Sequence, residues 1–134
     1  MGSLIDTSVW VDHFRPTTPA AVKSQVLFYV NQRDVCVGEP IIFELLAACS
    51  KRDRARIEMY FAVITVVSTP ASLWRDVTGL GQQCADAGLV VPAMDLLIAS
   101  LCVHHEVDLI TFDSHFAGIA RVAPLKVNCL TRAA

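Results

Sequence analysis

The stretch SLIDTSVW, residues 3–10, decides the fold and holds the first candidate site residue. Residues 3–5 form a short run that is mainly apolar, as in a buried strand, and Thr7 and Ser8 are residues that often begin helices. The stretch therefore predicts a strand, a tight turn and a short helix that ends before Pro16. Asp6 lies where the chain leaves the strand, and an ionised carboxylate beside an apolar core is costly unless it is paired or binds a cation.

Outward from this stretch, apolar β-branched runs alternate with helical periods along the chain. The predicted strands cover residues 3–5, 34–37, 63–67, 109–111 and 127–130. The predicted helices cover residues 7–14, 20–31, 40–49, 51–60, 69–88 and 92–102. This alternation implies an α/β fold, with a largely parallel sheet of about five strands and helices on both faces. A length of 134 residues fits one domain, residues 1–134.

Three further acidic residues stand in apolar surroundings, and none of the four has Lys or Arg within three residues. They are Glu44 in IIFELLA, Asp95 in PAMDLLIASL and Asp113 in DLITFDSHF. Ligands of open parallel sheets bind beyond the carboxyl ends of the strands, where a compact arrangement can gather all four acids. Oxygen-only clusters suit Mg²⁺ or Mn²⁺, which can activate water and stabilise a phosphoryl transition state. The predicted supporting hydroxyls are those of Thr7, Ser8, Thr111 and Ser114.

Each acid also has a simpler explanation. Asp6 and Asp113 could cap the helices that follow them, and Asp95 could be a favourable charge in the first turn of its helix. Glu44 could be a solvated helix residue, although its apolar neighbours argue against this. Four unrelated explanations at these positions are less economical than one shared site. Five other acids are expected to be solvated surface residues, namely Asp12, Asp53, Asp76, Asp86 and Glu106.

Composition limits the function classes. The chain is 54% hydrophobic and 18% charged, which predicts an ordered protein with some apolar surface covered by a partner or a second copy. Its net charge of −2 gives no overall basic field of the kind that many nucleic-acid binders carry. Five scattered cysteines without a CxxC pair predict reduced, buried thiols and a cytoplasmic protein. We expect no leader segment, and no apolar run reaches the ~18 residues of a membrane span.

The other polar candidates carry weaker signals. His115 lies two residues beyond Asp113 and could contact a phosphate, and Arg15 is a possible RNA contact. Surface positions are expected for His13, His104 and His105. The basic run from Lys51 to Arg56 is either a solvated face or a contact for RNA or an acidic partner.

Four stretches together resemble a known family. They are DTSVWVDHF, ELL, DLLIAS and ITFDSHF, and in order and spacing they resemble the four signature stretches of a PIN domain. More narrowly, they resemble the VapC-type ribonuclease toxins of bacterial toxin–antitoxin pairs. The resemblance implies an endoribonuclease that uses Mg²⁺, for which Mn²⁺ can substitute. Its metal ligands would be Asp6, Glu44, Asp95 and Asp113, with Thr7 and Thr111 in supporting positions. Many relatives have a further Asp where this chain has His115, which bears on how a second metal would be held.

The resemblance also implies partners. A VapB-like antitoxin would inhibit the enzyme, and the expected substrate is tRNA or rRNA. The expected assembly is a homodimer that forms a heterotetramer or larger complex with antitoxin. One alternative is a structure-specific nuclease of RNA processing or DNA repair, although no added DNA-binding module is evident. Another is a non-enzymatic, receiver-like signalling module that binds Mg²⁺, but Lys126 precedes the last strand and fits that function poorly.

Overall fold

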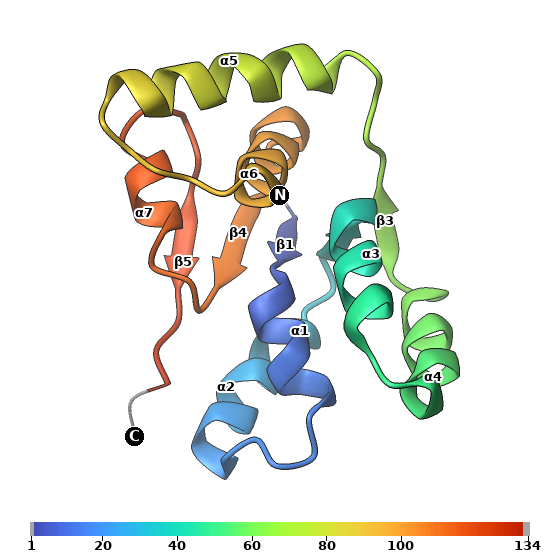
Figure 1. The fold of residues 1–134 in the computed structure, drawn as a ribbon. Helices are drawn as coiled ribbons and strands as arrows, with labels where there is room; N and C mark the ends of the chain where they lie inside the picture. The colour runs from blue at the N-terminus through green and yellow to red at the C-terminus, as the bar shows by residue number, and fades with distance from the viewer. Residues whose placement is uncertain (1, 133–134) are drawn as a thin grey trace.

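Five parallel strands form one sheet in the order β3-β2-β1-β4-β5 in the computed structural model, which describes residues 2–132 (Figure 1). The strands are β1 (Ser3–Ile5), β2 (Val35–Gly38), β3 (Thr65–Val67), β4 (Asp108–Thr111) and β5 (Val127–Cys129). In the central strand, Leu4 pairs with Cys36 of β2 on one side and with Leu109 of β4 on the other. The predicted parallel α/β sheet is therefore confirmed.

Seven helices connect the strands within the described part of the chain. They are α1 (Thr7–Phe14), α2 (Ala20–Val30), α3 (Glu39–Ala48), α4 (Lys51–Phe61), α5 (Leu73–Asp86), α6 (Ala93–His105) and α7 (Phe116–Ile119). Figure 1 shows α3 and α4 beside the β3 edge of the sheet and α7 beside the β5 edge. The strand order reverses direction between β3 and β4. Because parallel crossovers are right-handed, this reversal places the helices before β3 and those after it on opposite faces.

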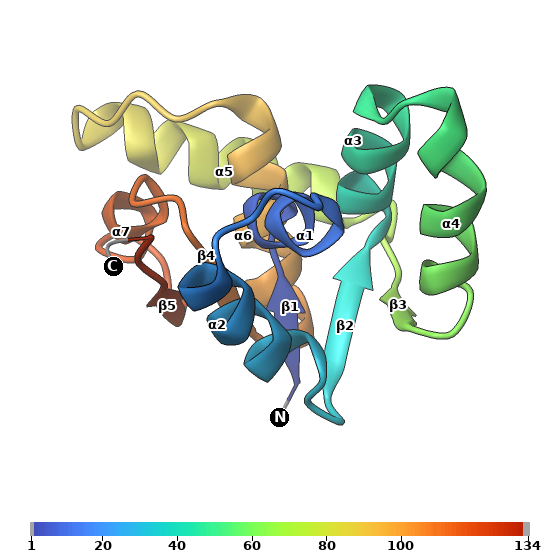
Figure 2. The ribbon, with the colours of Figure 1, turned by 90° about the horizontal axis from the view of Figure 1, so that it is seen from below.

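The reversal of strand order also locates the functional end of the sheet. Strands β1 and β4 are neighbours, and the connections that leave them run in opposite directions, which makes their carboxyl ends a topological switch point. Helix α6 runs back to the start of β4, so its first turn lies at the same end. Figure 2 views the sheet from below and shows α1 leaving β1 between the neighbouring helices.

The core lies where β1 meets α1. Leu4, Ile5, Val9 and Trp10 are fully buried, and the Trp10 indole donates a 3.0 Å hydrogen bond to the Ile5 carbonyl. An indole buried without a partner for its N–H would be destabilising, so this bond lets a large aromatic side chain fill the corner between strand and helix. The start of α1 is therefore held in a fixed position relative to β1.

Two predicted boundaries were wrong for local reasons. Helix α5 begins at Leu73 and not at Thr69, because the Leu73 amide bonds to the Pro70 carbonyl in a separate turn. Strand β3 begins at Thr65 and not at Val63, because the Val63 amide still bonds to the Tyr60 carbonyl at the end of α4. The short helix α7 was not predicted. The predicted stop at Gly88 is confirmed by its positive φ of 76° just after α5.

The cysteines follow the prediction only in part. All five are free, and Cys36, Cys84 and Cys102 are buried, but Cys49 is half-buried and Cys129 is exposed. The strand β5 that carries Cys129 lies at the edge of the sheet, which explains the exposure. Among the described residues no helix has the combination of length and apolar character that crossing a bilayer requires.

Candidate metal centre

Asp6 is the most buried acid at the carboxyl end of the sheet, with 5% of its surface exposed. It occupies the N-cap position of α1, yet its side chain makes no capping hydrogen bond. Instead, Oδ2 accepts hydrogen bonds from Ser8 Oγ at 2.9 Å and from Thr111 Oγ1 at 2.7 Å. The simple capping explanation is therefore wrong for Asp6. Two hydroxyl donors orient the carboxylate but leave its negative charge to be offset by something else.

The same two hydroxyls hold the loop after β4. Thr111 Oγ1 accepts a 2.9 Å hydrogen bond from the Asp113 amide, and Ser8 Oγ accepts one of 3.1 Å from the Phe112 amide. The Asp6 amide in turn donates to the Ile110 carbonyl at 2.9 Å. The start of α1 and the end of β4 are thus bonded to each other through both side chains and backbone. This network explains why a hydroxyl residue lies two positions from each acid, Ser8 after Asp6 and Thr111 before Asp113.

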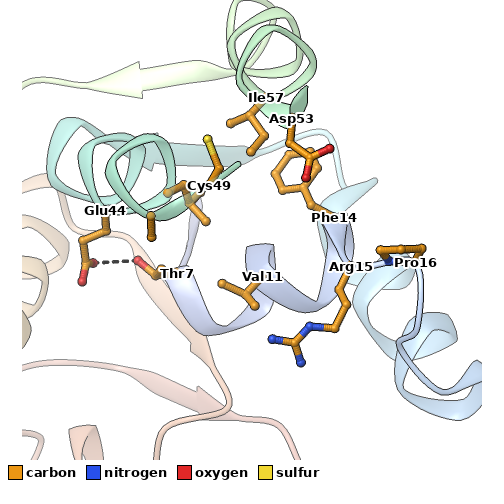
Figure 3. A pocket seen from close by; sticks show the side chains of 11 residues that line it. Thr7, Val11, Phe14, Arg15, Pro16, Glu44, Cys49, Asp53 and Ile57 are labelled. Atoms are coloured by element: carbon orange, nitrogen blue, oxygen red, sulfur yellow. Dashed lines mark hydrogen bonds between the residues drawn. The ribbon is translucent and has the colours of Figure 1, made fainter. Parts of the chain in front are cut away.

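Glu44 reaches the same end of the sheet from a different strand. It is the sixth residue of α3, which begins directly after β2. Its Oε1 accepts a 2.7 Å hydrogen bond from Thr7 Oγ1, drawn in Figure 3, and Thr7 is the first residue of α1. The supporting position predicted for Thr7 is therefore next to Glu44, and its hydroxyl fixes the direction of that carboxylate.

Asp95 shows that the four acids share one electrostatic environment. It lies half-buried in the first turn of α6. Burial, which is the largest cause, and the charges of Asp113, Asp6 and Glu44 together raise its pKa from 3.8 to about 6, while His115 acts in the opposite direction. Like charges gathered at this density favour either a proton or a cation.

Asp113 and His115 form the exposed side of the group. Ligand atoms of Asp95, Asp113 and His115 all lie within 4.8 Å of one another, and His115 Nδ1 is 3.1 Å from Asp113 Oδ1. Asp113 Oδ1 also accepts a 2.9 Å hydrogen bond from the His115 amide, so this acid shapes the turn before α7 as well. Sequence reasoning considered His115 for phosphate contact and not as a ligand. The signal for a ligand was its position two residues after an acid at a strand end.

A groove opens beside the acids, between α1, α3 and α4. It encloses a cavity of about 400 Å³. Figure 3 shows Thr7 and Glu44 at one end and Arg15 and Asp53 at the other. The remaining lining is mainly apolar and consists of Val11, Phe14, Pro16, Leu45, Ala48, Cys49 and Ile57. The possible RNA contact predicted at Arg15 therefore lies along a continuous surface that starts at the acids.

The other predicted supporting residue is less well placed. Ser114 is exposed, and its carbonyl accepts a hydrogen bond from the Ala117 amide at the start of α7. Ser114 therefore helps to form the turn, and a supporting role for its hydroxyl stays a prediction. The basic run on α4 is mostly exposed, but Arg56 donates to the Phe14 carbonyl at 3.1 Å and lies against the Phe14 ring. That arginine stabilises the contact between α4 and α1.

The donor set fits a hard divalent cation. Within residues 2–132, no Lys or Arg forms an ion pair with any of the four carboxylates. Asp95 and Asp113 lie within ligand distance of each other, and Asp6 and Glu44 are close enough for their charges to act on Asp95. Mg²⁺ and Mn²⁺ prefer such oxygen ligands. The residues that could hold the ion are Asp6, Glu44, Asp95 and Asp113, with His115 as a possible nitrogen ligand.

Comparisons with known proteins point to one family. The PIN domain model matches residues 3–122. Ribonuclease VapC11 of Mycobacterium tuberculosis is 30% identical over 127 residues, which cover 92% of this chain and 95% of that protein. Ribonuclease VapC19 of the same organism is 29% identical, covering 90% of this chain and 97% of that protein. The crystal structure of VapBC2 from Rickettsia felis, bound to a DNA fragment from its promoter, contains a chain with a TM-score of 0.77 and 16% identity, covering 97% of this chain and 99% of that chain.

Proposed function

The chain belongs to the PIN domain family, and from this premise we propose that it is a metal-dependent endoribonuclease of the VapC toxin type. The observation that carries the proposal is the convergence of four carboxylates, without Lys or Arg partners, at the switch point of the sheet. Relatives along nearly the whole chain are named ribonucleases, which supports RNA as the substrate. We propose tRNA or rRNA as the RNA class and the cytoplasm as the place of action.

The proposed catalytic residues are Asp6, Glu44, Asp95 and Asp113, which would bind Mg²⁺ or, in its place, Mn²⁺. A bound ion of this kind activates water and offsets charge on the phosphate and the leaving oxygen. Ser8 and Thr111 hold Asp6 by 2.9 and 2.7 Å hydrogen bonds, so the carboxylate keeps its orientation as substrate enters. Thr7 does the same for Glu44. Exposed His115 lies beside Asp113, and exposed Arg15 lies at the far end of the groove from Glu44. Both are proposed to contact RNA phosphates.

The test is incubation of the purified protein with a panel of cellular RNAs in Mg²⁺ or in EDTA, followed by mapping of the cut ends. We expect discrete cleavage sites that require the metal. Asp86→Asn is a matched control, because Asp86 is an exposed acid at the end of α5. Asp6→Asn and Asp95→Asn should remove the cleavage and Asp86→Asn should keep it. Cleavage that persists in EDTA and in both site variants would refute the assigned centre.

A second panel separates the alternative functions. DNA flaps and RNA processing intermediates should be cut poorly if the substrate is tRNA or rRNA. Preferred cleavage of flaps would favour a structure-specific nuclease, since the same acids could serve either substrate. Metal binding with no cleavage of any nucleic acid would favour the non-enzymatic Mg²⁺-binding module.

We propose an antitoxin of the VapB type as the protein partner. The Rickettsia felis structure is of a VapBC assembly. The groove between α1, α3 and α4 has an apolar wall that an amphipathic segment could cover, and it ends at Thr7 and Glu44. An Arg or Lys on such a segment would reach the carboxylates and replace the positive charge of the metal. The proposed antitoxin would thus block RNA and displace the ion together.

The antitoxin proposal is tested in cells. The chain is expressed alone and with the product of the adjacent upstream reading frame, and growth and RNA integrity are compared. We expect co-expression to restore both. A matched variant, Ala48→Glu, places a charge in the apolar wall of the groove and should weaken the rescue while RNA cleavage by the free protein persists. Equal growth with and without the upstream product would refute the toxin–antitoxin pairing but not the nuclease.

We also propose a homodimer, which would form a heterotetramer or larger assembly with antitoxin. Large apolar side chains remain exposed on the side of the molecule near β3, namely Phe43, Met59, Val63 and Val66. A second copy would cover such surface. One chain has a mass of 14.6 kDa, and light scattering at micromolar concentration should give twice that mass. A monomer at that concentration would rule out the dimer.

A further inference from the structure

The chain returns to the metal centre after its last strand. The Leu130 amide, just beyond β5, donates a 2.7 Å hydrogen bond to the carbonyl of Thr111, whose hydroxyl holds Asp6. Two residues later, Arg132 reaches α1, where its Nε lies 2.8 Å from Asp12 Oδ2. The end of the described chain therefore contacts α1 and the end of β4, next to which Asp6 and Asp113 lie. It does so although it lies more than a hundred residues from Asp12.

Asp12 explains why an arginine is needed at this position. Its surface is only 4% exposed, and a buried carboxylate without a cation is strongly destabilising. Arg132 supplies a charged hydrogen bond at 2.8 Å, whereas the guanidinium of Arg15 is 3.8 Å from the other oxygen. Arg132 is therefore the closer partner, and its location on α1 is fixed by the charge of Asp12.

The same guanidinium also covers the loop after β4. Its central carbon lies 4.3 Å from the centre of the Phe112 ring, which is close enough for a cation–π contact. Phe112 is the residue between Thr111 and Asp113, and its amide donates to Ser8 Oγ. The Phe112 backbone joins directly to the candidate ligand Asp113, so the packing of this ring bears on where that backbone lies.

We propose that Arg132 is a positioning residue for the metal centre. It fixes Phe112 against α1, and through Phe112 it sets the position of Asp113 relative to Asp6. Arg132 touches neither metal nor substrate. This inference rests on the proposed metal centre and adds to it a connection from the last strand of the sheet. A planar guanidinium can pair with a carboxylate and lie on an aromatic face at the same time. A lysine ammonium is less able to make both contacts at once.

The test measures metal binding directly, by calorimetric titration of Mn²⁺ without RNA. Arg132→Ala should weaken Mn²⁺ binding about tenfold, the low end of the range for residues that orient metal ligands. Arg132→Lys should give an intermediate loss, because it keeps the charge beside Asp12 and loses the planar contact. Arg15→Ala is the matched control for the charge near Asp12, because Arg15 does not contact Phe112. It should leave the Mn²⁺ affinity within about twofold of the parent, below the range for orienting residues.

A double-mutant cycle separates positioning from stability. Phe112→Leu keeps the Arg132–Asp12 pair and removes the aromatic face. If Arg132 acts through Phe112, Arg132→Ala should cost much less Mn²⁺ affinity in the Phe112→Leu background than in the parent. An arginine that only stabilises the fold would give the same loss in both backgrounds. RNA cleavage should show a lower kcat with KM little changed, because the arginine is remote from the substrate.

The outcomes distinguish this inference from the function on which it rests. A parent protein that binds no Mn²⁺ would overturn the metal centre itself. A parent that binds Mn²⁺ with an Arg132→Ala variant of equal affinity would overturn only the role of Arg132. If Arg132→Ala does not fold, Arg132→Lys and Phe112→Leu decide, and unchanged Mn²⁺ affinity in both would equally overturn it.

Discussion

Asp6, at the N-cap of α1, and Asp12, within the same helix, are two carboxylates that are almost equally buried, at 5% and 4% exposure. Asp12 has an arginine at 2.8 Å and a second one at 3.8 Å. Asp6 has two hydroxyl donors and, within the described chain, no Lys or Arg in an ion pair. The fold therefore supplies a cation to one acid and leaves the other for a cation from solution.

Burial alone does not distinguish a carboxylate with a structural role from one at a cation site. Asp12 has a structural role, since its pair joins α1 to the end of the chain. Asp6 has no such pair, and its charge, after burial and Asp113, is one of the causes that raise the pKa of Asp95. A buried acid with an arginine stabilises a fold, whereas a buried acid oriented only by hydroxyls and surrounded by other acids indicates a cation site.

The largest expected effect separates the two acids by function. Asp6→Asn keeps the size of the side chain and removes its charge. It should lower RNA cleavage by at least about a hundredfold, because loss of roughly 3 kcal/mol of transition-state stabilisation corresponds to more than two powers of ten. Its metal-free stability should be equal to or above that of the parent, since repulsion among the acids is reduced. Parallel measurement of cleavage rate and thermal unfolding checks both statements.

Asp12→Asn should show the opposite pattern. Loss of the buried charge should destabilise the fold by about 1–3 kcal/mol, a value below that of a fully buried pair because Arg132 is 53% exposed. Any change in cleavage measured well below the unfolding temperature should be smaller than that of Asp6→Asn. A stable Asp12→Asn protein without activity would contradict the division between the two acids.

Sequence reasoning found Asp6 and missed Asp12 for a physical reason. Asp6 follows a strand, and the rule that ligands bind at the carboxyl ends of parallel strands gathers it with the other acids. Asp12 lies in the polar-looking stretch VDHFR and was expected on the surface, which is wrong. Its partner Arg132 is 120 residues away, and no local pattern reports such a pair. Tertiary contacts over this distance fix burial, whereas strand and helix periods depend on neighbouring residues.

The same limit applies to boundaries and histidines. The periods of two and of 3.6 residues predicted the strands and most helices. Pro70, however, belongs to a separate turn whose sequence resembles the start of a helix. His13 was expected on the surface and is instead enclosed by Trp10, Phe14 and Tyr60. Its position is set by the approach of α4 to α1, which sequence periodicity does not encode.

Metal affinity should depend on pH through Asp95. With a pKa of about 6, this carboxyl is about 24% ionised at pH 5.5 and about 97% ionised at pH 7.5. Protons compete with the ion, so Mn²⁺ affinity should fall about fourfold at the lower pH from this group alone. In metal-free protein, the contribution of Asp95 to folding stability changes with pH in the opposite direction to its contribution to metal affinity. A carboxyl whose folded pKa is raised from 3.8 to about 6 loses its stabilising contribution as pH rises through that interval.

Calorimetric titrations at the two pH values check the metal dependence, and Asp95→Asn is the matched control. The variant binds more weakly overall and should lose the part of the pH dependence that Asp95 contributes. Equal affinities of the parent at pH 5.5 and 7.5 would contradict a crowded site.

His13 provides a third way to bury a polar group on α1, which is to keep it neutral. Burial, which is the largest cause, and the charges of Lys23 and Arg56 together lower its pKa from 6.5 to about 4. Its Nδ1 has no hydrogen-bond partner among the described residues. Because the unfolded state takes up the proton near pH 6.5, stability should fall as pH drops from 6.5 towards 4. Thermal unfolding from pH 7 to 4.5 measures the fall, and His13→Phe should reduce it.

The smallest expected effect concerns His115, at the exposed rim of the site. Its side chain is 69% exposed, so substitution should change stability little. His115 Nδ1 and Asp113 Oδ1 are 3.1 Å apart, close to the ~3.0 Å between adjacent ligands of an octahedral ion with bonds of about 2.1 Å. If the ring nitrogen is a ligand, His115→Ala should weaken Mn²⁺ binding about threefold and Mg²⁺ binding less, because Mg²⁺ accepts nitrogen ligands poorly. If the ring only pairs with Asp113, both ions should respond alike. Titration of each ion into parent and variant separates the two outcomes. The same titration extends the comparison of Asp6 and Asp12 to Asp113. It shows whether His115, the partner of Asp113, binds the metal together with this acid or competes with the metal for it.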